Sequence, residues 1–226
     1  MDLLSALSRH KSGTIQDFLD SRGHFHCCLS PDYRMIVKPP SGSFIGRVKT
    51  IAAEPLDKPE TAGRTTEGAV MVMKKYEAHV GRGDVVVMGP RTHEPFPPFE
   101  WVGGFIASLF RGGGAVGLVT PYVRDIEQIE PTGMGVVARG THPAIIRYRI
   151  KALGIGEPVC IGGVEAKTGD ILVADSDGTL VMPGDDKLVA ELVAELEKHA
   201  ELEKKAWADR ERGDPISEVF ARYGAL

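Results

Sequence analysis

Short apolar runs alternate with amphipathic stretches along the middle of the chain. The apolar runs at residues 43–53, 84–88, 115–119 and 135–138 predict buried strands. Between the first two, residues 67–80 have the apolar spacing of a helix, which ends at a glycine. Strands that alternate with helices are typical of an α/β layer fold with a parallel sheet. The pattern therefore predicts an α/β protein.

The two ends of the chain have helical patterns. Residues 3–9 and 14–21 predict two short helices, the second capped by Ser12 and ended by Gly23. From Asp185 onward the pattern predicts one long helix, which Pro215 ends before a short last helix at 216–223. Its apolar stripe contains Leu188, Val189, Leu192, Val193 and Leu196 and continues to Ala200 and Trp207.

Length and composition suit a single domain over residues 1–226. We expect a helical segment at about 1–40, a core at about 42–183 and C-terminal helices at about 184–226. The 27 glycines and 7% aromatic residues fit an α/β protein with many tight turns. A net charge of −4, with no basic run, argues against a nucleic-acid partner.

The cysteines and the N-terminal residues indicate the cellular compartment of the protein. The chain has three cysteines, two of them adjacent (Cys27-Cys28), which cannot form a disulfide framework. The start MDLLSALSRHKSG lacks the apolar core of a signal peptide, and the apolar runs are too short to cross a bilayer. We expect a cytoplasmic protein with no membrane partner.

An arginine and an aspartate, Arg124 and Asp125, follow the predicted strand at 115–119. Thr120-Pro121 is expected to end that strand, and the two charges then lie at the carboxyl edge of the sheet, where open α/β folds bind ligands. A guanidinium can bind a carboxylate through two hydrogen bonds, and a carboxylate can hold a hard divalent cation. A solvated ion pair in a loop is the alternative interpretation.

Two blocks of sequence resemble a known family. They are residues 115–143, AVGLVTPYVRDIEQIEPTGMGVVARGTHP, and residues 159–183, VCIGGVEAKTGDILVADSDGTLVMP. Both are similar to the family that contains 4-hydroxy-4-methyl-2-oxoglutarate aldolase and the regulator of ribonuclease activity A. The resemblance implies an α/β swivelling β/β/α-type domain with a central sheet, helices on its faces and a long C-terminal helix, assembled as a homotrimer or homohexamer.

The resemblance also implies an activity. It suggests a carbon–carbon lyase that depends on Mg²⁺ or Mn²⁺ and acts on a 2-oxo acid, as a pyruvate aldolase or an oxaloacetate-type decarboxylase. Arg124 and Asp125 would be catalytic, with Asp125 as the metal ligand. Arg124 and the amides of Gly103, Gly104 and Phe105, at the start of a predicted helix, would bind the substrate.

Three positions bear on how closely the family's chemistry carries over. The family has an acid twenty-one positions before the arginine, where this chain has Gly103, and it tends to have another where this chain has Gln128. Restoring the acid by Gly103→Asp is expected to raise turnover if the backbone admits a side chain. The family's long helix offers a glutamate to a neighbouring subunit, and Glu203 is the candidate here, with Glu201 almost equivalent.

Other motifs are weaker. Residues 24–28, HFHCC, contain zinc-ligand residue types, but a strand with alternating buried residues is the favoured interpretation. Residues 112–117 fit G-x-G-x-x-G but follow a helix instead of a strand, so we expect a turn. Residues 175–178, DSDG, begin like a calcium loop, and a hairpin turn explains them.

Two alternatives to a lyase remain from the sequence. One is a non-catalytic regulatory binding protein, like the ribonuclease regulators of the family; Asp125 argues against it. The other is a methyltransferase, for which no glycine-rich loop follows a strand. Residues 141–143 and 147–151 are candidates to contact the tail of a substrate.

Overall fold

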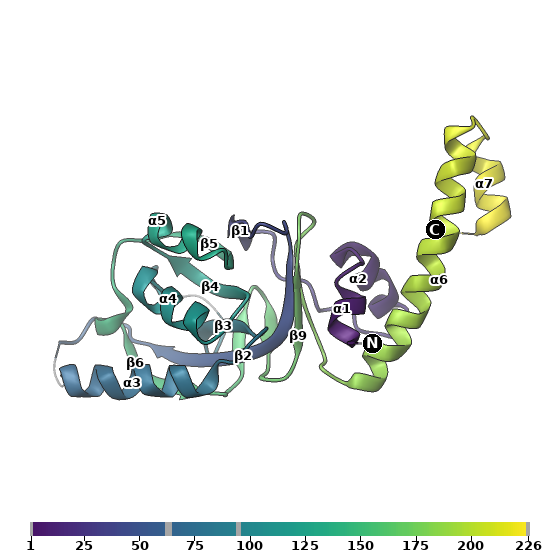
Figure 1. Ribbon diagram of the computed structural model, residues 1–226. Coiled ribbons are helices and arrows are strands. Elements are labelled where there is room, and N and C mark those ends of the chain that lie inside the picture. The colour runs from purple at the N-terminus through teal and green to yellow at the C-terminus, as the bar shows by residue number, and fades with distance from the viewer. Residues whose placement is uncertain (1, 62–64, 94–95, 225–226) are drawn as a thin grey trace.

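The computed structural model describes residues 2–61, 65–93 and 96–224. Its main sheet orders the strands β1-β5-β4-β3-β2-β9-β10, and β6 also pairs with β2 (Figure 1). The strands β2, β3, β4 and β5 run parallel to one another, and β1, β6, β9 and β10 pair antiparallel. The bounds of these strands are β1 Arg34–Val37, β2 Phe44–Pro55, β3 Val85–Pro90, β4 Gly117–Val123, β5 Gly135–Thr141, β6 Ile150–Ile155, β9 Ile171–Ala174 and β10 Thr179–Met182.

Each crossover between parallel strands contains a helix. In chain order these are α3 (Thr66–His79), α4 (Gly104–Gly112), and α5 (Ile126–Ile129) with the short turn η1 (Glu130–Thr132). They cover one face of the sheet, where alternate strand residues such as Val86 and Met88 face them in one core. Val85 and Val87 belong to a second core on the other face, which the hairpin of β7 (Val159–Ile161) and β8 (Val164–Ala166) closes. The layering confirms the predicted α/β fold.

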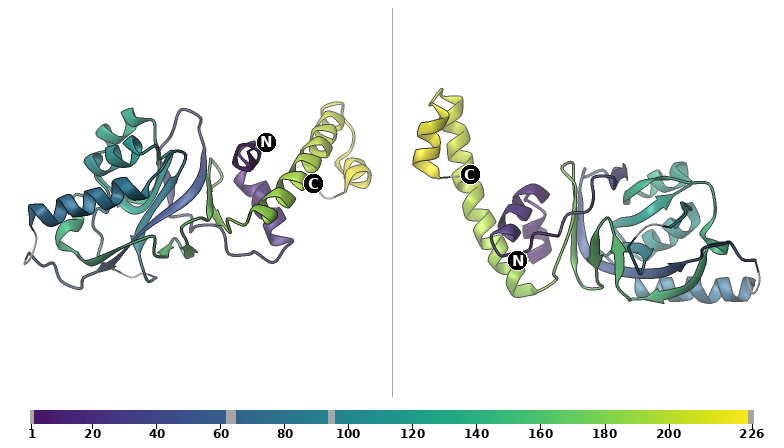
Figure 2. Two further views of the ribbon diagram at one scale, coloured as in Figure 1. Left: turned by 60° about the horizontal axis from the view of Figure 1, so that its bottom comes forward. Right: turned by 180° about the vertical axis from the view of Figure 1, so that it is seen from behind.

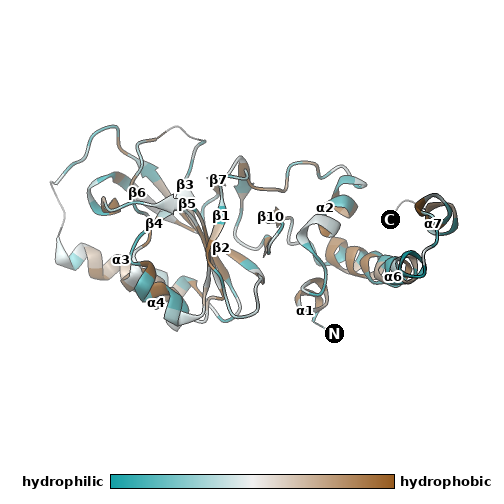
Figure 3. Ribbon diagram, turned by 90° about the horizontal axis from the view of Figure 1, so that it is seen from above, coloured by the Kyte–Doolittle hydropathy of each residue, from teal (hydrophilic) through white to brown (hydrophobic). Residues whose placement is uncertain are grey.

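A third core lies beside β9 and β10. Here α1 (Leu3–Leu7) and α2 (Ser12–Asp20) pack with α6 (Asp186–Glu211), so the two ends of the chain meet (Figure 2). Hydrophobic positions follow the part of α6 that runs beside α1 and α2 (Figure 3). Within the described ranges, every helix is too short or too polar to cross a bilayer.

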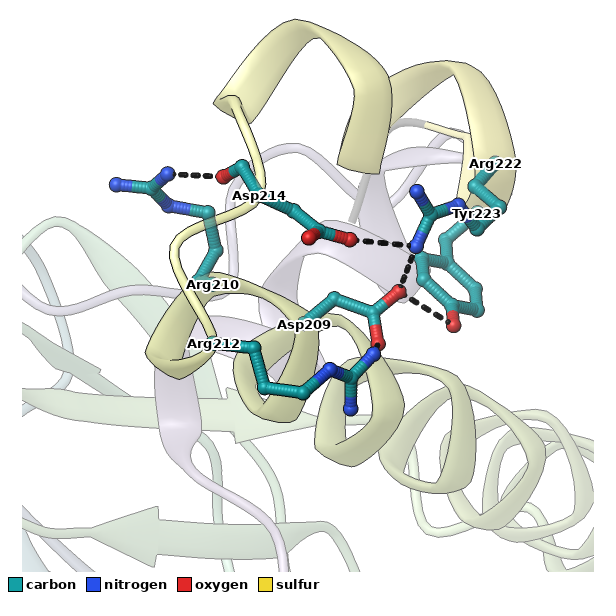
Figure 4. A network of polar contacts seen from close by, with 6 residues as sticks. All are labelled: Asp209, Arg210, Arg212, Asp214, Arg222 and Tyr223. Carbon is teal, nitrogen blue, oxygen red and sulfur yellow. Dashed lines mark hydrogen bonds and ion pairs between the residues drawn. The ribbon is translucent and has the colours of Figure 1, made fainter.

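The far end of α6 carries the last helix, α7 (Ile216–Tyr223), which Pro215 precedes as the sequence predicts. The carboxylate of Asp209 is buried between the two helices and accepts a hydrogen bond from the Tyr223 hydroxyl at 3.0 Å (Figure 4). It also forms ion pairs with Arg212 and Arg222. The predicted apolar stripe is therefore wrong beyond Leu196: Trp207 is 63% exposed and Ala200 is exposed, while Ala206 and Asp209 are buried.

Three further expectations need correction. Residues 24–28 form no strand beyond a single bridge between Cys28 and Leu180, because they cross from α2 to the sheet. The helix α2 begins at Ser12 itself, whose amide and hydroxyl both donate to Asp175, at 2.8 and 2.7 Å. Thr120 and Pro121 do not end β4, which continues to Val123.

Candidate functional site

The dipeptide Arg124-Asp125 directly follows the last residue of β4, at the carboxyl edge of the parallel sheet. Pro121 does not interrupt the strand because β3 pairs with β4 only as far as Val119. Proline has no backbone N–H to donate, and at position 121 no hydrogen bond to β3 is lost, because β3 no longer pairs with β4 there. Residues 101–102, which follow β3 in the chain, bond to the end of β4 in place of β3. Trp101 N donates to Tyr122 O at 2.9 Å, and Arg124 N donates to Val102 O at 3.2 Å.

The pairing of residues 101–102 with the end of β4 brings the next two residues, Gly103 and Gly104, beside Arg124 and Asp125. Gly103 is the N-cap of α4, and Gly104 is its first residue. The Gly104 amide donates to Oδ2 of Asp125 at 3.1 Å. The structure therefore brings together the sequence-predicted residues Gly103, Gly104, Arg124 and Asp125, and Phe105 lines the same cavity.

Asp125 has a left-handed backbone, with φ 59° and ψ 44°. Among the described residues it is the one non-glycine with positive φ. That conformation costs about 1–3 kcal/mol in a side-chain-bearing residue and is found at functional sites more often than elsewhere. Here the turn directs the carboxylate back towards the start of α4, where Gly104 donates to it.

A buried acid that the sequence analysis missed completes this cluster. Glu100 is 3% exposed, and its Oε2 accepts from Ile146 N at 3.3 Å and lies 3.9 Å from a terminal nitrogen of Arg124. Burial raises the pKa of the Glu100 carboxyl; Arg124 and the Ile146 amide oppose this effect, and Asp125 adds to it. A signal existed in the sequence: a lone acid between Phe99 and Trp101, three residues before the paired glycines.

Glu100 occupies space beside the position where the family has its acid. A Cβ atom on Gly103 would lie 2.8 Å from Asp125 Oδ2, 3.2 Å from Glu100 Oε1 and 3.4 Å from Arg124 Nε. The φ of Gly103 is −102°, so its backbone would accept a side chain. The obstacle is space, because the neighbouring carboxylates crowd the position.

The guanidinium of Arg124 lies between the two acids. Its Nε is 3.5 Å from Asp125 Oδ2, and a terminal nitrogen donates to Pro143 O at 3.3 Å. Within the described part of the chain, the buried Nε has no hydrogen-bond partner. The Arg124 side chain as a whole is about one-third exposed, and an exposed guanidinium beside a helix N-terminus favours an anionic ligand.

These residues line a cavity of about 490 Å³ between α3, α4 and residues 145–150. Ligand sites are commonly of this size, with a few convergent polar groups on a mostly apolar wall. The lining contains no lysine among the described residues, so no candidate for a Schiff base with a 2-oxo acid faces this cavity.

The donor set fits a hard, water-carrying cation better than a caged one. The side chain of Asp125 is about one-third exposed, and its contacts within the described residues all involve Oδ2. Oδ1 therefore remains for a cation. No cluster of three His, Cys, Asp or Glu residues that could hold a metal occurs in the described ranges. A single carboxylate suits Mg²⁺, which keeps several waters, and not structural zinc, which takes four protein ligands.

Other predicted residues lie elsewhere. Within one chain, Glu203 is on α6, which extends away from α4 and α5, and its carboxylate accepts from the Trp207 indole at 3.3 Å. Its role at a neighbouring site stays a prediction. Residues 112–117 form the turn from α4 into β4, and residues 175–178 form the hairpin between β9 and β10, as predicted.

Comparison with known proteins identifies the class. Residues 12–181 match the RraA-like family, described as Aldolase/RraA, and the chain belongs to this family. A protein of Arabidopsis thaliana named "Putative 4-hydroxy-4-methyl-2-oxoglutarate aldolase 3" is 31% identical over 143 residues, which are 58% of this chain and 82% of that protein. A relative from Azotobacter vinelandii named as the same aldolase is 37% identical over 86 residues; the match spans 36% of this chain and about half of the relative, 51%.

Solved structures agree on the fold. The Streptomyces coelicolor protein RraAS2, titled an unusual member of the RNase ES inhibitor RraA protein family, has a TM-score of 0.72 at 23% identity and covers 94% of this chain and 96% of its own. An uncharacterized protein of Pseudomonas syringae pv. tomato has a TM-score of 0.76 at 21% identity. The match covers 98% of this chain and 93% of that protein.

Proposed function

We propose that this protein is a divalent-metal-dependent carbon–carbon lyase that acts on a 2-oxo acid. The observation that carries the proposal is the convergence of Arg124, Asp125, Glu100 and the N-terminus of α4 on one cavity. Cleavage next to a 2-oxo acid produces an enolate, and its negative charge needs fixed donors. The relatives from Azotobacter vinelandii and Arabidopsis thaliana carry the name "Putative 4-hydroxy-4-methyl-2-oxoglutarate aldolase", which agrees with this chemistry.

Arg124 and the helix N-terminus would hold the anionic end of the substrate. The first amides of α4 precede the first intrahelical bond, from Ala107 N to Gly103 O. They carry the positive end of the helix dipole. The guanidinium of Arg124, whose side chain is about one-third exposed, would add donors for the oxyanion that develops at C2.

Glu100 would move the proton in place of the acid missing at Gly103. As a carboxylate it accepts the proton of the C4 hydroxyl while the C3–C4 bond breaks. C4 becomes the carbonyl of the released product, and the bonding electron pair forms the enolate of pyruvate. Return of the proton from Glu100 to C3 yields pyruvate. In a decarboxylation the same enolate forms as CO₂ leaves, and the proton that joins C3 would come from Glu100 after that residue has taken it up from solvent.

Asp125 would hold the metal, Mg²⁺ or Mn²⁺. When bound, such a cation withdraws electron density from the C2 carbonyl and so stabilises the enolate. The residues of the chain then orient the substrate and exclude water around it.

The direct test is pyruvate release from a panel of 4-hydroxy-2-oxo acids and oxaloacetate, with Mg²⁺, with Mn²⁺ and with excess chelator. Metal-dependent release from at least one acid supports the proposal. Absence of release from every acid would favour the alternative, a non-catalytic binding protein of the same fold, which the name of the RraA inhibitor family suggests.

A further inference from the structure

The wall of the cavity beside Arg124 is apolar over most of its extent. Four residues of the lining, Glu100, Gly103, Arg124 and Asp125, contact or approach one another closely and so form one cluster. Away from that cluster the lining includes Val72, Met73, Tyr76, Ile106, Ile145, Ile146 and Ile150. We name this part the apolar wall.

The apolar wall comes from three segments of the chain. Val72, Met73 and Tyr76 lie on α3, with side-chain spacing that places them on one face of the helix. Ile106 lies on the first turn of α4. Ile145, Ile146 and Ile150 lie on the segment that follows Ala144, whose carbonyl oxygen accepts a hydrogen bond from Glu100 N at 2.8 Å. The hydrogen bond between Glu100 and Ala144 therefore also places the isoleucines of the apolar wall beside Glu100.

A second carboxylate on the substrate would find little support here. Among the described residues of the lining, Arg147 is the other cationic side chain besides Arg124; it is exposed and has its guanidinium 5.8 Å from the centroid of the Tyr148 ring. Burial raises the pKa of Tyr76, so its phenol stays neutral. A carboxylate placed against the apolar wall, away from Arg124 and Arg147, would lose its hydration without a paired charge, whereas a hydrocarbon would gain from burial there.

We propose that the apolar wall binds the tail of the substrate, and that the preferred substrate is a 4-hydroxy-2-oxo acid with an alkyl or aryl group at C4 instead of a second carboxylate. This inference rests on the proposed function. The products are pyruvate and an apolar aldehyde or ketone: the proton leaves the oxygen of the C4 hydroxyl, the C3–C4 bond breaks, and a proton joins C3.

The first measurement is kcat/KM of the native protein for a series in which the C4 group is methyl, propyl, pentyl or phenyl, compared with 4-hydroxy-4-methyl-2-oxoglutarate. Each buried methylene is worth roughly fourfold, from about 0.8 kcal/mol. We expect kcat/KM to rise along the alkyl series until the cavity is full, and the dicarboxylate to be at least about tenfold below the best monocarboxylate. A dicarboxylate that is cleaved best would overturn the inference.

A pair of variants on α3 locates the tail. Met73→Lys places a cation in the apolar wall, and Met71→Lys makes the same change on the same helix at a residue that is 58% exposed and outside the lining. Met73→Lys should lower kcat/KM for the pentyl acid about tenfold or more and raise it for the dicarboxylate, because the new ammonium pairs with the second carboxylate. Met71→Lys should change neither. Equal effects of the two variants would contradict this placement.

Binding distinguishes this inference from the proposed function. The acid 2-oxo-4-phenylbutanoate has no 4-hydroxyl to deprotonate, and we expect calorimetry to show that it binds more tightly than 2-oxoglutarate. If the dicarboxylates bind and are cleaved best, the proposed function stands and the tail inference fails. If no 2-oxo acid binds or is cleaved, both fail.

Discussion

Glu100, which we propose as the acid of this site, lies three residues before the position where the family resemblance places one. Gly103 leaves the space that a side chain would fill, and Glu100 and Asp125 crowd that space from two sides. A carboxylate is thus present beside Arg124 although position 103 has none. The residue-scale claim is that Glu100 does the work of the missing acid.

Glu100→Gln tests this claim. The amide retains the shape and an oxygen to accept from Ile146 N, but it cannot accept a proton from the substrate. Loss of general acid–base assistance typically costs about 10²–10⁴-fold, so kcat should fall by that order while pyruvate binding changes little. Glu127→Gln, an exposed glutamate on α5, is the matched control and should retain full activity. Equal rates for native protein and Glu100→Gln would contradict the assignment.

The close approach of Glu100 and Asp125 to Gly103 leads us to a different prediction for Gly103→Asp. The backbone admits a side chain, but the new carboxylate would meet those of Glu100 and Asp125, and like charges at this distance repel. We expect the single variant to lower kcat about tenfold or more. Combined with Glu100→Ala, which removes one of the two crowding acids, the same change should raise kcat above that of Glu100→Ala alone. A single Gly103→Asp variant that is faster than native would show that the position is not crowded.

The sequence predicted part of this site. Arg124 and Asp125 could be placed at the sheet edge because they follow an apolar run, and Gly103 and Gly104 because they precede a helix. Glu100 could not, because its burial depends on pairing with residues more than forty positions away: Glu100 bridges to Ile145, and its carboxylate accepts from Ile146. The left-handed backbone of Asp125 has no local signal either, since no glycine marks the turn.

At the scale of elements, the site depends on how β4 ends. Beyond the end of its pairing with β3, the strand β4 pairs with Trp101 and Val102. This pairing places Gly103 and Gly104 beside Arg124. The strands and helices of the parallel layer were predictable from apolar runs and glycine stops. The strands β1 and β6 were not, because their short patterns are completed only by antiparallel partners, β5 and β2.

A second element-scale feature joins the start of α2 to the hairpin between β9 and β10. Burial would raise the pKa of Asp175, but hydrogen bonds from Ser12, Asp177 and Gly178 outweigh it and lower the pKa. A carboxyl with a lowered folded pKa stabilises the protein above its unfolded pKa of about 4, and that contribution is lost as pH falls through the folded pKa.

Asp175→Asn should therefore destabilise the protein by about 1–3 kcal/mol at pH 7 in urea unfolding, because buried hydrogen bonds to a charged acceptor weaken. The difference from native should shrink as pH is lowered below about 4. Asp177→Asn, an exposed change in the same turn, is the control and should have little effect. A difference that stays constant down to pH 2 would contradict the role of the charge.

On the scale of the whole molecule, α6 and α7 form an arm that extends from the sheet (Figure 1). It carries exposed apolar side chains, with Trp207 63%, Ile216 57% and Phe220 46% exposed. Such a surface suits contact with another subunit. We retain the prediction of a trimer or hexamer in which Glu203, beside Trp207, reaches a neighbouring site.

Subunit mixing tests that prediction. Asp125→Ala and Glu203→Gln should each be inactive or strongly impaired as homo-oligomers. After the two are mixed, unfolded and refolded together, some sites would combine an intact Asp125 with an intact Glu203 from a neighbour. About a quarter of native activity should return for random assembly. Full activity of Glu203→Gln alone, or no recovery on mixing, would contradict a shared site.

The central claim is that Asp125 holds a divalent cation that the lyase reaction requires. The most direct measurement is the rate of pyruvate release, by native protein and by Asp125→Ala, across a titration of Mg²⁺ from chelated to saturating concentration. We expect the native rate to rise with Mg²⁺ to a plateau, and Asp125→Ala to stay near the uncatalysed rate throughout while circular dichroism shows an intact fold. An unchanged native rate in excess chelator, or full activity of Asp125→Ala, would contradict this claim.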